Sequence, residues 1–157
     1  MYQQKRNAIK LHLAFELNRL IPAQFLSTEA KASARKILRQ RLEVGVTSIA
    51  DRGYVCFKLF HDLGAGQAHF IIRATSNLVY DLYETLPVEM PEPWATFFTG
   101  VEDRRRRFTN DPHQHDYRLV SFMAMGEYFS LITDRFDLRT SEVIMLYAYR
   151  WQVELIF

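Results

Sequence analysis

Two acidic residues and their neighbours have types and spacing that could bind divalent cations. Tyr147, Arg150 and Glu154 follow one another at helical intervals, so at about 100° per residue they share one narrow stripe of a helix. Asp51 follows residues 46–50, a short apolar run that predicts a strand inside an α/β sheet. Ligands bind such sheets just beyond the carboxyl ends of strands, and Mg²⁺ or Mn²⁺ prefers carboxylate oxygens. Asp51 and Glu154 are therefore candidate metal ligands.

The spacing of Arg150 and Glu154 also has a structural interpretation. An arginine and a glutamate at this interval on a surface helix form an ion pair that contributes only a few tenths of a kcal/mol. Spacing alone leaves the two interpretations open.

The segment 140–157 predicts the helix that carries these residues. Thr140 could cap its start by accepting a backbone N–H, and Glu142 suits the positive end of the helix dipole. Neither glycine nor proline interrupts the rest of the segment, and from residue 143 onward only Arg150 and Glu154 are charged. We therefore expect this helix to be buried on most sides.

The first half of the chain alternates between strand and helix patterns. Strands are predicted where apolar residues alternate or run together, and helices where capping residues and glycines bound a periodic segment. The predicted strands are residues 8–17, 46–50 and 68–75, and the predicted helices are residues 28–44 and 54–63. Because the two kinds alternate, we expect an α/β fold with a parallel sheet and helices on its faces.

The pattern changes between residues 76 and 116. Three prolines crowd one part of this segment and disfavour helix there. After it, two further strands are predicted at residues 117–125 and 127–133, separated by Gly126.

Composition places the chain among ordinary globular proteins. Its 157 residues, 48% hydrophobic and 24% charged, suffice for one domain with a core. No apolar run approaches the roughly 20 residues that span a bilayer, and no apolar signal segment follows the N-terminus, so a cytoplasmic location without membrane contact is expected. The single cysteine, Cys56, excludes an internal disulfide, and a net charge of +2 indicates nothing about nucleic acid by itself.

His113 and His115 lie in a short polar stretch between Asp111 and Asp116. Two histidines at this spacing are typical of a metal-binding loop. The sequence offers no fixed partner for them, so an ordinary loop is the alternative.

The candidate site residues stand in two motif blocks that resemble the DDE transposases of bacterial insertion sequences. The block containing Tyr147, Arg150 and Glu154 is similar to the Tyr-Arg-Glu-Lys signature of one branch of that family. Residues 51–54, which read Asp-Arg-Gly-Tyr, and residues 70–73 resemble the stretch around the family's second catalytic Asp. Together the likeness covers almost the whole chain.

This resemblance implies a ribonuclease-H-like α/β fold, with a mixed sheet, flanking helices and a β-rich insertion before the last helix. Residues 1–75 and 117–157 would form the catalytic core, and residues 76–116 would form the insertion. The core would be incomplete because its first strand would be missing.

The resemblance also implies roles for the motif residues. Asp51 and Glu154 would be catalytic and bind Mg²⁺ or Mn²⁺, while Tyr147 and Arg150 would hold phosphate of a transposon end. The implied activity is metal-dependent cleavage of double-stranded DNA at transposon ends, with strand transfer into target DNA as the second step. Full-length relatives would act as dimers.

A run of arginines supplies the other candidate contacts to DNA. Its members are Arg104, Arg105, Arg106 and Arg107. Acidic residues flank the run, so a solvated loop fits it equally well.

The match to the family pattern is incomplete at both ends. No Asp precedes Asp51, whereas the family carries its first catalytic Asp on its first strand, and the Lys of the signature would fall beyond Phe157. We therefore expect a chain truncated at both ends. The alternative function is that of a non-catalytic, DNA-binding remnant of such a transposase.

Overall fold

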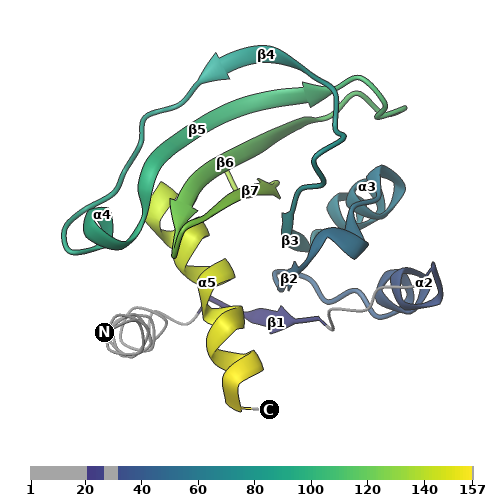
Figure 1. The fold of residues 1–157 in the computed structure, drawn as a ribbon. Coiled ribbons are helices and arrows are strands. Elements are labelled where there is room, and N and C mark those ends of the chain that lie inside the picture. The colour runs from purple at the N-terminus through teal and green to yellow at the C-terminus, as the bar shows by residue number, and fades with distance from the viewer. Residues whose placement is uncertain (1–20, 27–31, 157) are drawn as a thin grey trace.

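Residues 21–26 and 32–156 are described by a computed structural model of the chain (Figure 1). The strand predicted over residues 8–17 lies outside the described residues. The helices and strands are β1 (Ala23–Phe25), α2 (Ala32–Gln40), β2 (Thr47–Ala50), the 3₁₀ helix η2 (Arg52–Tyr54), α3 (Phe57–Ala65), β3 (His69–Arg73), β4 (Tyr80–Thr85), α4 (Trp94–Phe97), β5 (Thr99–Phe108), β6 (Asp116–Ala124), β7 (Glu127–Thr133) and α5 (Thr140–Ile156).

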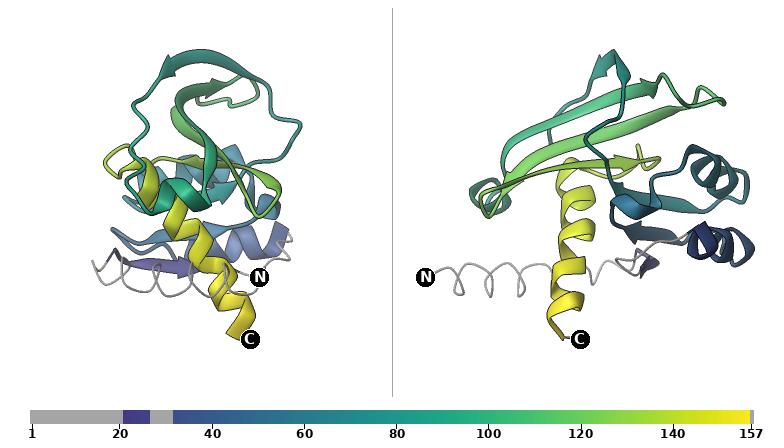
Figure 2. Two further views of the ribbon diagram at one scale, coloured as in Figure 1. Left: turned by 60° about the vertical axis from the view of Figure 1, so that its left-hand side comes forward. Right: turned by 45° about the vertical axis from the view of Figure 1, so that its right-hand side comes forward.

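The described strands form one mixed sheet in the order β1-β2-β3-β7-β6-β5-β4. Strands β1, β2 and β3 are parallel, as predicted for the two buried runs of the first half, and the remaining pairings are antiparallel. The long strands β5 and β6 arch over the short parallel strands in Figure 1, while α5 and the helices α2 and α3 stand on different sides of them in Figure 2. A mixed sheet with flanking helices confirms the predicted ribonuclease-H-like fold class.

The sheet separates two apolar clusters. On one face, Val143 and Leu146 of α5 pack in a cluster with Ile49 of β2. On the other face, Phe60 of α3 packs in a cluster with Ala50 of β2. Successive side chains of a strand point to opposite faces, so the residue that comes after Ala50 is directed toward the face that α5 covers.

The predicted C-terminal helix is confirmed, but its predicted cap is wrong. The Thr140 hydroxyl accepts the N–H of Glu89 at 3.0 Å and donates to Asp103 at 2.7 Å. Instead, the carboxylate of Glu142 accepts the N–H of Arg139, at the helix start, at 3.0 Å. Although α5 is apolar, neither it nor any other described helix is long and apolar enough to cross a membrane.

The helix predicted over residues 28–44 was wrong at its end. Helix α2 ends at Gln40, and Gly45, with a φ of +79°, lies in the turn before β2. The Gly45 N–H donates to the carbonyl of Gln67 at 2.9 Å. Gly45 is therefore part of the turn that leads the chain back into the sheet. An unpredicted strand, β1, pairs along β2.

The arginine run is part of a strand, so its interpretation as a loop was wrong. Arg105 and Arg107 lie on β5, between β4 and β6. A carboxylate on each neighbouring strand pairs with them: Glu84 lies 3.1 Å from Arg105, and Asp116 lies 2.9 Å from Arg107. A short helix, α4, also interrupts the segment where helix was not expected. The division into core and insertion stays a prediction, since β4 and β5 belong to the same sheet as the rest.

The predicted strand pair around Gly126 is confirmed as the β6–β7 hairpin. Met125 and Gly126 have φ values of +51° and +75°. Positive φ at both central residues is typical of a type I′ turn, whose twist matches that of the two strands.

A buried ion pair links β5, β6 and the start of α5. Arg118 donates from Nε and Nη2 to Asp103 at 2.9 and 2.6 Å, and both side chains are almost fully buried. The Thr140 hydroxyl also donates to Asp103, and Arg118 Nη1 donates to the carbonyls of Arg135 and Leu138 at 2.9 and 2.6 Å. Because the charges are paired and hydrogen-bonded, this network fixes where α5 begins.

Replacing Asp103 tests that anchor. Asp103→Ala leaves Arg118 buried without its carboxylate, so we expect the free energy of unfolding to fall by about 3–5 kcal/mol, as measured by urea unfolding. The matched control is Glu102→Ala, which removes an exposed partner of Arg104 and should cost about 1 kcal/mol at most. Equal losses in the two variants would contradict the anchoring role.

Candidate active site

Asp51 lies where the sequence predicted it, directly after the buried strand β2. Its side chain caps η2, because Oδ1 accepts the N–H of Gly53 at 3.1 Å. The short turn therefore holds the carboxylate at the carboxyl end of a parallel strand, which is where sheets of this kind bind ligands.

Helix α5 brings the second motif block to Asp51. Arg150 Nη2 lies 3.5 Å from Asp51 Oδ2, and the two side chains are 7% and 21% exposed. Two residues that the sequence separates widely therefore form an ion pair in a largely buried position. Helix α5 therefore presents Arg150 to the carboxyl end of β2.

Tyr147 lies one turn before Arg150 on the same stripe and is buried. The Arg150 guanidinium carbon lies 6.0 Å from the centre of the Tyr147 ring. Burial raises the pKa of the Tyr147 phenol, and the positive charges of Arg150 and Arg73 offset part of that rise. At neutral pH, Tyr147 is therefore a neutral phenol that can donate a hydrogen bond.

Glu154 belongs to α5, but its side chain lies outside the described side chains. One helical turn separates it from Arg150, which corresponds to about 6 Å along the axis. Its joint coordination of a cation with Asp51 therefore stays a prediction.

Sequence reasoning assigned no role to Arg73, which the structure places beside this site. Its guanidinium lies 4.3 Å from the centre of the Phe129 ring, and that ring packs edge-on against Tyr147. Arg73 also donates to the carbonyl of Tyr128 at 3.0 Å. Arg73 lies in a motif block near the end of a predicted strand, and this position in the sequence could have identified it as a site residue.

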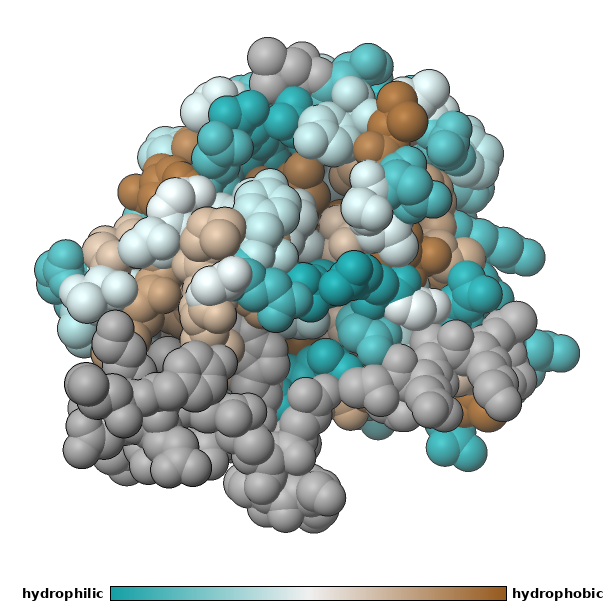
Figure 3. Space-filling view, viewed as in Figure 1, coloured by the Kyte–Doolittle hydropathy of each residue, from teal (hydrophilic) through white to brown (hydrophobic). Residues whose placement is uncertain are grey.

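A hollow of about 200 Å³ lies beyond the carboxyl ends of β2 and β3, and Arg52 and Arg73 line it together with Tyr128 and Ser130. On the face seen in Figure 3, hydrophilic side chains gather across the middle, below the antiparallel strands. Asp51 does not line this hollow, and the arginine that contacts Asp51 is Arg150.

The structure does not bring the arginine run of β5 to Asp51. Four strand spacings, or about 19 Å, separate β5 from β2 in the sheet. The arginines also contact aromatic rings: Arg106 lies 4.3 Å from the centre of the Tyr80 ring. A DNA contact through this run stays a prediction and would belong to a separate surface.

The chemistry of Asp51 fits a hard divalent cation. A carboxylate accepts only, and Asp51 is partly exposed, with one oxygen capping η2 and the other facing Arg150. Within the described side chains, no cluster of three possible metal ligands includes Asp51. A cation bound by Asp51 would need further ligands beyond the side chains that the structure describes.

The mixed sheet with its flanking helices places the chain in the ribonuclease-H-like fold class. The family model described as "Transposase DDE domain" matches residues 2–157, so the chain belongs to the transposase DDE domain family. Members of this family bind DNA and use divalent metal ions.

The chain is also similar to a protein of Sinorhizobium fredii (strain NBRC 101917 / NGR234) that is named "Putative transposase y4zB". The two are 25% identical over 154 residues, which cover 95% of this chain and 43% of that relative. The chain thus spans less than half the length of the relative.

Tyr147→Phe tests the buried phenol. Because burial raises the folded-state pKa above the unfolded value of about 10, the stability from the neutral phenol is present below pH 10 and lost as pH rises further. At pH 7 we expect the variant to lose about 1 kcal/mol with the hydroxyl. Urea unfolding should show this deficit shrinking above pH 10.

Tyr128→Phe is the control, since the Tyr128 side chain is largely exposed. We expect it to unfold like the wild type at both pH values. A deficit of Tyr147→Phe that is the same at pH 7 and above pH 10 would contradict the buried, neutral state.

Proposed function

We propose that this chain supplies part of the catalytic core of a transposase, which cleaves DNA at transposon ends and joins the ends to target DNA. The observation that carries the proposal is the contact between Asp51 and Arg150. It joins the two motif blocks of the family at the carboxyl end of a parallel strand, within the family's fold.

In this proposal, Asp51 and Glu154 hold Mg²⁺ or Mn²⁺ together with a further acid, since no Asp precedes residue 51 in this chain. When bound, a pair of such ions stabilises both the attacking and the leaving oxygen of a phosphoryl transfer. Catalysis therefore requires the further acidic ligand in addition to Asp51 and Glu154.

The residues of α5 position the DNA. A guanidinium has five N–H donors in a planar fork, so Arg150 can contact Asp51 and a phosphate of the transposon end together. Buried Tyr147 supports Arg150 from the preceding turn and contributes a neutral donor. Arg73, which pairs with Glu127 at 2.9 Å, lies close enough to Tyr147 to lower the pKa of its phenol.

Arg150→Gln tests the phosphate contact. We expect it to weaken binding to a fluorescent DNA duplex about tenfold and to reduce the slope of log affinity against log salt by about one, because one phosphate contact is lost. Fluorescence anisotropy at several salt concentrations measures both quantities.

The matched control is Arg139→Gln, at the start of α5, where the arginine pairs with Glu142 at 3.2 Å. Its DNA affinity should remain within twofold of the wild type, and this limit includes the small loss of general electrostatic attraction. If Arg150→Gln binds DNA as the control does, Arg150 is not a phosphate ligand.

Asp51→Asn tests the metal ligand. Removing the carboxylate charge should weaken Mn²⁺ binding, measured by electron paramagnetic resonance, at least tenfold. Asp62→Asn is the control, because Asp62 is a partly exposed carboxylate of α3 that pairs with Arg39. Unchanged Mn²⁺ affinity in Asp51→Asn would remove Asp51 from the metal site.

The second candidate function is DNA binding without cleavage. It is kept because no Asp precedes Asp51 in this sequence, whereas the family carries its first catalytic Asp on its first strand. Purified chain, duplex DNA and Mg²⁺ distinguish the two functions: salt-sensitive binding without a Mg²⁺ effect supports the second candidate, and Mg²⁺-dependent cleavage supports the first. A dimer as the active assembly stays a prediction.

A further inference from the structure

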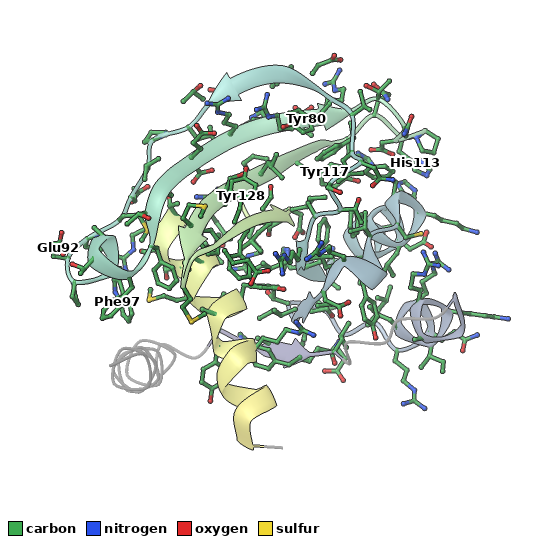
Figure 4. All side chains as sticks on the ribbon, viewed as in Figure 1. Tyr80, Glu92, Phe97, His113, Tyr117 and Tyr128 are labelled. Atoms are coloured by element: carbon green, nitrogen blue, oxygen red, sulfur yellow. The ribbon has the colours of Figure 1, made fainter. Side chains whose placement is uncertain are left out.

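Three histidines gather where α3 meets the loop between β5 and β6. His61 comes from α3, and His113 and His115 come from the loop; one ring nitrogen of each lies within 4.8 Å of the others. His61 Nδ1 lies 2.9 Å from His115 Nε2. Figure 4 shows His113 at the tip of this loop, beside α3.

The loop is built so that both of its histidines face α3. Buried Asp111 accepts the backbone N–H of His113 through Oδ1 at 2.9 Å and that of His115 through Oδ2 at 3.0 Å. Gln114, between them, has a φ of +52° and donates from its side chain to the Asp111 carbonyl at 2.6 Å. The backbones of both histidines are therefore fixed before any ligand binds.

The contact between His61 and His115 requires an unprotonated ring nitrogen. One of the two facing nitrogens must accept the hydrogen bond, and an imidazole with such a nitrogen is the form that binds metal ions. His113 is stacked on His61, with ring centres 3.7 Å apart. The three donor groups are thus already close together, on a partly exposed surface.

We propose that His61, His113 and His115 bind a transition-metal ion, Zn²⁺ in the first place, with water as the fourth ligand. Zinc is held by imidazole nitrogens at about 2.0–2.1 Å, which places tetrahedral ligand atoms about 3.3 Å apart. The three ring nitrogens now lie within 4.8 Å of one another. Rotation of the side chains, including the stacked His113 ring, would bring them to the shorter distance.

This site differs from the carboxylate site in its ligand chemistry and its place in the fold. Imidazole suits zinc, whereas carboxylate and water suit magnesium or manganese. The histidines lie on the side of the sheet that carries α3, whereas Asp51 contacts α5. The proposal is therefore independent of the proposed transposase activity.

The bound ion would tie α3 to the β5–β6 loop. Phe60, next to His61, and Tyr117, two residues after His115, already pack edge-on with ring centres 5.7 Å apart. The bound metal would hold α3 and the loop together at the exposed end of this contact. It would therefore cross-link the first and second halves of the chain.

The test uses the 157-residue chain without a histidine tag. Titration with Zn²⁺ by calorimetry, in excess Mg²⁺, should give one site, and Co²⁺ should produce the visible absorption of a tetrahedral complex. His61→Gln, His113→Gln and His115→Gln should each weaken Zn²⁺ binding at least tenfold. At a hundredfold excess over its Kd, Zn²⁺ should raise the wild-type Tm by about 5–10 °C.

His69→Gln is the matched control, because His69 pairs with Asp134 instead of the cluster, and its Zn²⁺ affinity should stay within twofold of the wild type. Asp51→Asn should also retain Zn²⁺ binding, which separates this site from the carboxylate site. Circular dichroism verifies folding of each variant, and the exposed positions 113 and 115 provide variants that do not disturb the core.

Two results would each overturn the proposal. One is a wild-type chain that gives no tetrahedral Co²⁺ spectrum and no Zn²⁺-dependent rise in Tm. The other is a folded His113→Gln or His115→Gln variant whose Zn²⁺ affinity is within twofold of the wild type.

Discussion

The buried pair of Asp103 and Arg118 is the interaction on which the geometry of the candidate active site depends. Removing two charges from water is costly, and the cost is offset here because Thr140 and two backbone carbonyls satisfy the remaining donors and acceptors. Thr140 begins α5, and a helix rises about 1.5 Å per residue. Fixing its first residue against β5 and β6 therefore fixes how far along the sheet Arg150 reaches.

The other half of the site depends on β2. This strand is buried along its whole length between β1 and β3. The two apolar clusters on opposite faces of the sheet therefore determine to which face each of its side chains points. A shift of one residue would exchange the faces to which Ile49 and Ala50 point and would turn Asp51 away from α5. The ion pair of Asp51 and Arg150 is thus a consequence of two independent constraints, one on a strand and one on a helix.

The parts of the fold that the sequence predicted are those with a strong periodic signal. β2, β3, the β6–β7 hairpin and α5 have apolar patterns that specify both their type and their place. Asp51 and Arg150 could be assigned to one site because each lies in a motif on such an element. The type of strand or helix could be inferred from the residues themselves, whereas the site required the family pattern.

The parts that the sequence did not predict depend on partners from elsewhere in the chain. Consecutive arginines have no strand pattern, and in β5 the carboxylates of Glu84 and Asp116 on the neighbouring strands pair with Arg105 and Arg107. Gly45 was predicted to end a helix, but it has a positive φ and lies in a turn, where its N–H donates to the carbonyl of Gln67. Local propensity cannot reveal such contacts, since they exist only after the sheet has assembled.

The histidine cluster shows the same limit and links the two candidate metal sites. His113 and His115 were visible as a pair, but His61 lies on a helix far away in sequence, and only the packing of α3 on the sheet unites them. Asp51 caps η2, which leads directly into α3, the helix that carries His61. An ion that restrains α3 would therefore also restrain the turn that orients Asp51.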